Sequence, residues 1–183
     1  SYIAAACVNE GIEIVDLDLC FEEHPNKSVE DKVKTSKPDI IALSIRNVDT
    51  ATTTGLKYYL DYYKDLVSNI KKYFNGTIII GGSGFSIMPE RFMEELKVNY
   101  GIFGEGEIVF PKLVKSIVEN KKVDDIPGVV YRKDNQIHIN EFIPVILPFP
   151  RSYWVIPGKL LAGHIPTNKD EKVSNTKISN LIN

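Results

Sequence analysis

Hydrophobic residues recur along this chain with two different periods, and their order predicts a mixed α/β fold. Continuous apolar runs at 39–44 (DIIALS) and 77–80 (TIII) are typical of strands that are buried on both faces. Between these runs, residues 54–74 carry apolar side chains at spacings of three and four, which predicts an amphipathic helix of about five turns. Residues 12–19 alternate aliphatic with acidic side chains, so we expect a third strand there.

Shorter segments continue the alternation of strands and helices. We expect a helix over 1–9, another that Ser28 caps, and a strand over 100–103 between helices that begin near Pro89 and at 107. Gly128 to Arg132 and Gln136 to Asn140 predict a hairpin. Strands that alternate with helices at this spacing predict a doubly wound parallel sheet with a C-terminal hairpin.

The regular pattern ends after Phe142, where prolines punctuate the sequence. We therefore divide the chain into an α/β domain at 1–125, a hairpin and proline-rich connector at 126–152, and an irregular or mobile tail at 153–183.

Composition and charge narrow the possible functions. The formal net charge of −2 does not indicate the basic surface that nucleic-acid-binding proteins typically have. The sequence contains no apolar run of about 18 residues and no segment typical of a signal peptide, so we predict a cytoplasmic protein without a membrane span. Its two cysteines, Cys7 and Cys20, are too few for an iron–sulfur cluster.

Three loops follow predicted strands and precede predicted helices. Because ligands of open α/β sheets bind beyond the carboxyl ends of the strands, these loops are the candidate site. They comprise Ser44, Ile45, Arg46 and Asn47, then Gly81, Gly82, Ser83, Gly84 and Phe85, and finally Gly104, Glu105 and Gly106. A strip of glycine backbone without side chains suits a broad, flat ligand, although glycines that only form turns remain an alternative.

The glycine spacing disfavours a phosphate-dominated ligand. In the pattern Gly-x-Gly-x-x-Gly/Ala, the third small residue falls on Ile87 after Gly82 and Gly84, and on Val109 after Gly104 and Gly106. The chain also lacks the Gly-Lys-Ser/Thr sequence of a P-loop.

Five ordered segments carry a resemblance to a known family, and they span roughly residues 1–152. The segments are PDIIALSIRNVD (38–49), GTIIIGGSGFSIMPE (76–90), YGIFGEGEIVFPKLV (100–114), IPGVVYR (126–132) and LPFP (147–150). Together they resemble the cobalamin-binding domain of cobalamin-dependent radical S-adenosylmethionine enzymes. The resemblance implies a flavodoxin-like, Rossmann-type fold that holds a corrinoid at the strand ends.

The same resemblance assigns roles to the three loops. Ser44 to Asn47 would lie along the corrin ring or its nucleotide tail. The segment from Gly81 to Phe85 would form the wall of the tail pocket, with the glycines admitting the tail and Phe85 as an apolar contact. Gly104 to Gly106 would close the far side with backbone amides.

Two departures from the resembling families limit what this chain is expected to do. The Asp-x-His-x-x-Gly sequence that places a histidine under cobalt in related cobalamin domains is missing, and His24, His138 and His164 stand elsewhere, so we expect no protein imidazole on cobalt. The correspondence also places the first strand before Ser1, and residues 151–183 contain no cysteine for a cluster. We therefore expect this chain to bind cobalamin, but no iron–sulfur cluster or S-adenosylmethionine, and to catalyse nothing alone. Its radical domain would be part of the full-length protein or act in trans.

Two other function classes stay open. A stand-alone α/β enzyme could use Glu105 and Glu107 as an acid–base pair on a small substrate, although Glu107 also suits a helix N-terminus electrostatically. A degenerate interaction module could use the tyrosines of the long helix, which are Tyr58, Tyr59, Tyr62 and Tyr63.

Overall fold

The chain forms two units, 1–142 and 143–183, which are considered separately. The computed structural model describes residues 2–50, 55, 57–141, 152–156 and 160–163. No helix in these described ranges is both long enough and apolar enough to cross a membrane.

The first unit is built on one five-stranded sheet in the order β1-β2-β3-β4-β5. Strands β1 (Ile40–Ser44), β2 (Thr77–Gly81) and β3 (Tyr100–Ile102) are parallel, as the sequence predicts. Strands β4 (Val129–Lys133) and β5 (Gln136–Ile139) form the predicted hairpin and pair antiparallel to β3. The hairpin therefore extends the same sheet.

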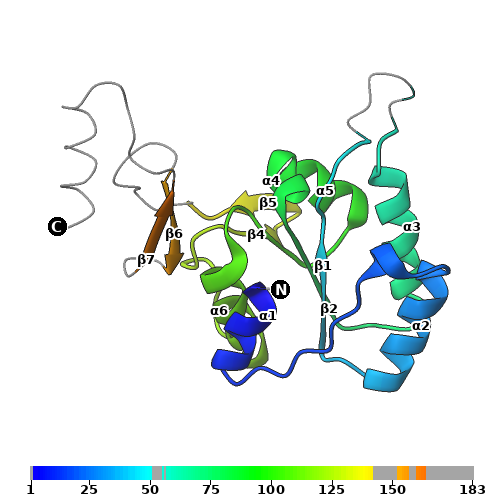
Figure 1. Ribbon diagram of the computed structural model, residues 1–183, viewed down its shortest axis with the longest axis horizontal. Coiled ribbons are helices and arrows are strands. Elements are labelled where there is room, and N and C mark those ends of the chain that lie inside the picture. Colours follow the sequence, from blue (N-terminus) through cyan, green and yellow to red (C-terminus); the bar gives the residue numbers. More distant parts are fainter. Residues whose placement is uncertain (1, 51–54, 56, 142–151, 157–159, 164–183) are drawn as a thin grey trace. The chain divides into compact units, whose positions relative to one another are not determined.

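Helices cover both faces of this sheet, as Figure 1 shows. Helices α1 (Tyr2–Asn9) and α6 (Gly106–Val118) pack together on one face. Helices α2 (Pro25–Ser36), α3 (Leu60–Ile70) and α5 (Pro89–Leu96) cover the other face. The mixed α/β architecture with a mostly parallel sheet is thereby confirmed.

Strand β2 joins the two hydrophobic cores, because successive side chains of a strand point to opposite faces. Ile78 and Ile80 belong to the cluster under α3 and α5, whereas Ile79 belongs to the cluster under α1 and α6. All three side chains are at most 2% exposed.

The predicted strand over 12–19 is wrong. Residues 12–18 pair with no strand in the described part of the chain, and Leu19–Phe21 form a single 3-10 turn, η1. The aliphatic pattern instead records how this connection is buried: Ile12 and Ile14 contact the cluster under α1 and α6, and Leu17 and Leu19 contact the other cluster. A two-residue period can therefore arise from a connection that crosses between two cores.

The helix predicted over 54–74 is shorter in the structure. It begins at Leu60 and ends at Ile70. Before it, residues 48–50 and 57–59 form a small antiparallel arm, in which Tyr59 N–H donates to the Val48 carbonyl and Thr50 N–H donates to the Lys57 carbonyl. Tyr58 and Tyr59 therefore precede the helix, although their spacing matches its apolar pattern.

Strand β1 is less buried than the sequence predicts. It occupies the edge of the sheet, so that β2 is its one strand partner among the described residues. Ile40, Ile41 and Leu43 are half-buried and Ala42 is exposed. The apolar run correctly predicts a strand but wrongly predicts burial on both faces.

The second unit contains a hairpin of β6 (Ser152–Ile156) and β7 (Leu160–Gly163). These strands correct the prediction of an irregular tail over their residues. The physical reason is visible in the sequence, because Tyr153, Trp154, Val155 and Ile156 are aromatic or β-branched residues that favour strands. The rest of the predicted tail, at 157–159 and 164–183, lies outside the described residues.

Candidate functional site

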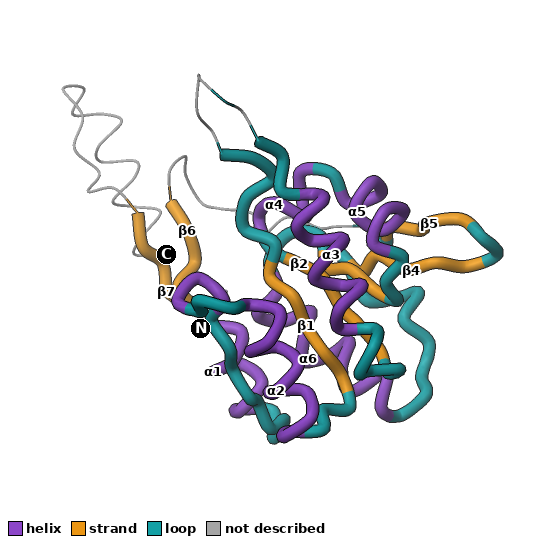
Figure 2. Tube along the Cα trace, turned by 90° about the vertical axis from the view of Figure 1, so that its right-hand side faces the viewer, coloured by secondary structure: helices purple, strands orange, loops and turns teal. Residues whose placement is uncertain are grey.

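The three predicted loops lie at the carboxyl ends of β1, β2 and β3. The tube view in Figure 2 shows the short helix α4 (Ser83–Ile87) at this end of the sheet, directly after β2. Because the three strands are parallel and adjacent, their following loops share one edge. Hydrogen bonds then join the loops into a continuous surface.

The first and second loops are fastened together by backbone hydrogen bonds. Ile45 N–H donates to the Gly81 carbonyl over 2.7 Å, and Gly84 N–H donates to the Ile45 carbonyl over 2.9 Å. The hydroxyl of Ser83 donates to the Arg46 carbonyl over 2.9 Å. The two loops therefore act as one rigid element.

Two glycines make this close contact possible. Gly82 has φ +98° and ψ 172°, a backbone conformation that residues other than glycine rarely adopt. A Cβ at Gly82 would lie 2.7 Å from the Ile45 carbonyl oxygen, and one at Gly84 would lie 3.0 Å from the Arg46 carbonyl carbon. The space beside these glycines is thus filled by the first loop, whereas the sequence interpretation gave it to the ligand's tail.

Ser86 connects the second loop to the third. Its hydroxyl donates to the Gly82 carbonyl over 3.2 Å and accepts from Gly104 N–H over 3.0 Å. Gly104 has φ +84°, which turns the chain from β3 into α6. Ser86 belongs to the second candidate loop but was not among the predicted binding residues, although its position four residues after Gly82 is the spacing of a helical back-bond.

The predicted site residues differ in what they offer to a ligand. Exposed side chains come from Ser44, Arg46, Asn47, Ser83 and Glu105. Gly81, Gly82, Gly104 and Gly106 are half-buried and Gly84 is buried. The edge therefore presents polar side chains and glycine backbone.

Ile45 and Phe85 lie beneath this surface and are 0% exposed. The Phe85 ring packs against Phe92 with ring centroids 6.3 Å apart, and it fills the space that a side chain at Gly101 would need. Neither residue therefore offers accessible surface to a ligand. The prediction of Phe85 as an apolar ligand contact does not fit its buried ring.

Tyr63 holds the first loop from the side. Its hydroxyl donates to the Asn47 carbonyl over 3.2 Å, and its ring meets Phe92 edge-to-face with centroids 6.0 Å apart. Burial raises the pKa of Tyr63, so the hydroxyl stays protonated and available as a donor at neutral pH. The sequence analysis named Tyr63 only as a possible interaction residue.

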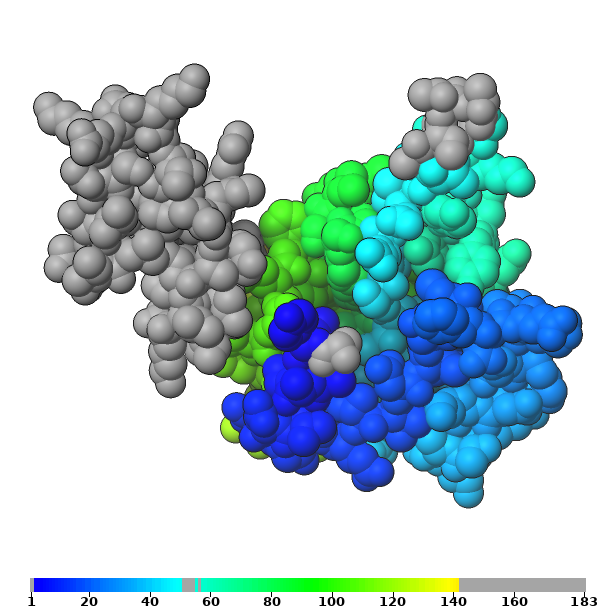
Figure 3. Space-filling model, viewed as in Figure 1, coloured from blue at the N-terminus to red at the C-terminus, as the bar shows by residue number. Residues whose placement is uncertain are grey.

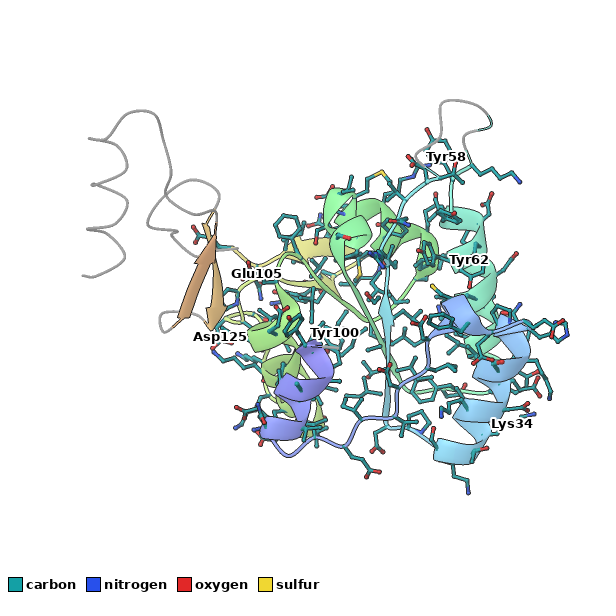
Figure 4. All side chains as sticks on the ribbon, viewed as in Figure 1. Lys34, Tyr58, Tyr62, Tyr100, Glu105 and Asp125 are labelled. Carbon is teal, nitrogen blue, oxygen red and sulfur yellow. The ribbon has the colours of Figure 1, made fainter. Side chains whose placement is uncertain are left out.

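The other candidate residues lie around or away from this edge. Glu105 and Glu107 are both exposed at the start of α6, as the stick view in Figure 4 shows for Glu105. His24 precedes α2, and His138 stacks on Tyr131 in the β4–β5 hairpin. His164 lies outside the described residues. No group of three or more His, Cys, Asp or Glu side chains within the described ranges has metal-site geometry.

A family model for the B12-binding domain matches residues 1–114, which include all three loops. This chain belongs to the B12-binding domain family. The match confirms the family that the five sequence segments indicate.

Similar proteins include two methyltransferases. Tryptophan 2-C-methyltransferase of Streptomyces laurentii is 25% identical over 72% of this chain and 22% of its own length. An uncharacterized methyltransferase of Pyrococcus horikoshii is 26% identical over 88% of this chain and 35% of its own length. The chain thus spans about a fifth to a third of these relatives.

Solved structures share the fold of this B12-binding domain. The radical S-adenosylmethionine methyltransferase TsrM from Kitasatospora setae, with cobalamin and a [4Fe-4S] cluster bound, has a TM-score of 0.73 at 22% identity. This likeness covers 80% of the present chain and 26% of TsrM. The cobalamin-dependent radical enzyme OxsB with aqua-cobalamin and S-adenosylmethionine has a TM-score of 0.55 at 20% identity, over 73% and 17% of the two chains.

Proposed function

We propose that this chain binds a corrinoid at the carboxyl ends of β1, β2 and β3 and serves as the cofactor module of a radical S-adenosylmethionine methyltransferase-type system. The observation that carries the proposal is the position of the three joined loops inside the segment that matches the B12-binding family. Membership of the B12-binding family indicates the class of ligand, and the geometry of the three loops supports this edge of the sheet as the binding surface.

The chemistry of this edge fits a large ligand with amide side chains. Ser44, Asn47 and Ser83 offer hydroxyl and amide groups, and Arg46 offers a guanidinium without a hydrogen-bond or ion-pair partner among the described residues. Glycine backbone between them lets a broad surface approach closely. These groups would bind and orient the ligand, while buried Ile45 and Phe85 hold the loops from below.

The chain's own residues would perform binding rather than catalysis. In the enzymes that this domain resembles, a bound corrinoid supplies a cobalt-carried methyl group. The iron–sulfur cluster and S-adenosylmethionine would be held by a radical domain, either in the same polypeptide or in trans. Neither Glu105 nor Glu107 is needed for this role.

We further propose that no histidine of this chain coordinates cobalt. His24 and His138 lie outside the three loops, on α2's N-terminal side and on β5. Electron paramagnetic resonance of the reduced cob(II)alamin complex would test this, because an axial nitrogen splits each cobalt line into three. Axial splitting that disappears in His24→Ala, His138→Ala or His164→Ala would contradict the proposal.

The binding proposal is tested by adding hydroxocobalamin to the purified protein. We expect a change in the visible spectrum that saturates at one equivalent, and co-elution of corrinoid with protein in gel filtration. A protein that is folded by circular dichroism but gives neither result would overturn it.

A further inference from the structure

Asn47 is the last residue of the first candidate loop, and a single hydrogen bond holds it in place. Earlier in the loop, Ile45 is fastened to the second loop by its backbone hydrogen bonds with Gly81 and Gly84. Asn47 makes no such bond to the second loop. Among the described residues, its one hydrogen bond is the one that its carbonyl accepts from the Tyr63 hydroxyl. The position of this end of the loop therefore depends on Tyr63.

Tyr63 reaches Asn47 because the chain leaves the site after the first loop and then returns. Residues 48–50 and 57–59 form the antiparallel arm, and the arm leads directly into α3, whose first turn contains Tyr63. In Figure 3 the cyan atoms that follow β1 lie beside the turquoise atoms of α3. The Tyr63 hydroxyl thus closes an excursion of 16 residues at its base.

The Tyr63 ring has a rigid support. It packs half-buried on the hydrophobic cluster under α3 and α5, and its edge-to-face contact with Phe92 joins it to a fully buried ring. Phe92 also contacts Phe85 in the second loop. Tyr62 packs edge-to-face on Tyr63 with ring centroids 5.5 Å apart. Tyr63 therefore contacts the first loop through its hydroxyl and is joined to the second loop through Phe92.

The group that this support orients is the side chain of Asn47, which is exposed at the candidate site. Its carboxamide has two N–H donors and an acceptor oxygen, and these groups complement the amide side chains of a corrinoid. A loop end that loses its one hydrogen bond spends less time in the conformation that binds. The apparent affinity for a ligand falls in proportion to that fraction of time.

We propose that Tyr63 is a positioning residue of the corrinoid site, which holds the Asn47 backbone so that the Asn47 carboxamide faces the ligand. This inference rests on the proposed corrinoid function. Tyr63 acts without touching the ligand, whereas the residues predicted from the sequence to bind it all lie within the three loops. The inference also gives Tyr63 a function inside the chain rather than on a surface for a partner protein.

The test is a double-mutant cycle measured by hydroxocobalamin titration of the 183-residue protein. Tyr63→Phe keeps the ring and removes only the hydroxyl. We expect it to weaken corrinoid binding about fivefold, the size expected for one neutral hydrogen bond. In a protein that already carries Asn47→Ala, Tyr63→Phe should have no further effect, because no carboxamide remains to be oriented. A residue with a merely structural role would weaken binding equally in both backgrounds.

Tyr62→Phe is the matched control. Tyr62, labelled on α3 in Figure 4, lies next to Tyr63, and its hydroxyl makes no hydrogen bond among the described residues. We expect Tyr62→Phe to bind hydroxocobalamin as tightly as the wild type. Circular dichroism of each variant first establishes that the protein is folded.

Three results would overturn the inference while leaving the corrinoid function intact. They are equal affinity of Tyr63→Phe and the wild type, an equal loss of affinity in Tyr62→Phe, and a loss in Tyr63→Phe that persists in the Asn47→Ala background. A folded wild type that binds no corrinoid would instead overturn the proposed function, and this inference with it. The titration of the wild type therefore distinguishes the two failures.

Discussion

Strands β1 and β2 have almost the same apolar composition but very different surroundings. Ile78, Ile79 and Ile80 in β2 are buried between two strands and two layers of helices. In β1, Ile41 and Leu43 pack on the same cluster as Ile78 and Ile80 but remain half-buried, because the strand has one described neighbour. A strand's composition therefore reports the burial it is suited to, whereas its neighbours decide the burial it has.

The largest expected effect is on the free energy of unfolding, and it compares one side chain from each of the two strands. Ile80→Ala removes a fully buried side chain between two strands and should destabilise the protein by about 3–4 kcal/mol. Leu43→Ala removes a half-buried side chain and should cost about 1–2 kcal/mol. Urea unfolding at equilibrium measures both, and equal costs would show that β1 is as well covered as β2.

The second prediction compares glycines that follow the strands. Gly82→Ala combines a backbone conformation that disfavours side chains with an overlap on the Ile45 carbonyl, and should destabilise by about 2–3 kcal/mol. Gly81→Ala meets Ile102 only at ordinary contact distance, 3.6 Å, and should cost about 0.5 kcal/mol or less.

A control separates backbone strain from the overlap. Gly11 has φ +75° with no atom within 4 Å of an added Cβ, so Gly11→Ala should cost about 1 kcal/mol from strain alone. Thermal unfolding of Gly82→Ala, Gly81→Ala and Gly11→Ala measures the order of their destabilisation. If Gly11→Ala and Gly82→Ala cost the same, close packing of the first two loops does not contribute.

The smallest effect concerns the bond between the second and third loops. Ser86→Ala removes both hydrogen bonds of its hydroxyl and should destabilise by about 1 kcal/mol. Ser36→Ala, in which the lost hydroxyl bonds only to Lys32 within α2, is the matched control. Hydrogen exchange should increase at Gly104 N–H in Ser86→Ala alone, and an unchanged rate would argue against the connection.

Much of the fold follows from local signals in the sequence. Pro89 at the first turn predicts α5, the TIII run predicts β2, and Asp134-Asn135 forms the turn of the hairpin with φ 49° and 63°. The errors have non-local causes. Residues 12–18 pair with no strand among the described residues, and Tyr58 and Tyr59 continue a helical spacing in an arm that its own hydrogen bonds hold extended.

The position of the candidate site could be predicted from the sequence, but the packing between its loops could not. Strand ends and glycines locate the three loops from sequence alone. Spacing could not show that Gly82 and Gly84 contact the backbone of Ile45 and Arg46, because that contact joins residues about forty positions apart. The burial of Phe85 against Gly101 is hidden from the sequence for the same reason.

The most direct test of the central claim is a hydroxocobalamin titration of the wild-type protein, Gly82→Ala and Gly11→Ala, each checked for folding first. If the joined loops form the corrinoid surface, the wild type and Gly11→Ala, whose substitution lies outside the three loops, bind one equivalent with similar affinity. Gly82→Ala, whose first two loops can no longer pack together, should bind at least tenfold more weakly. Equal affinity in all three proteins, or no binding by the folded wild type, would contradict the claim.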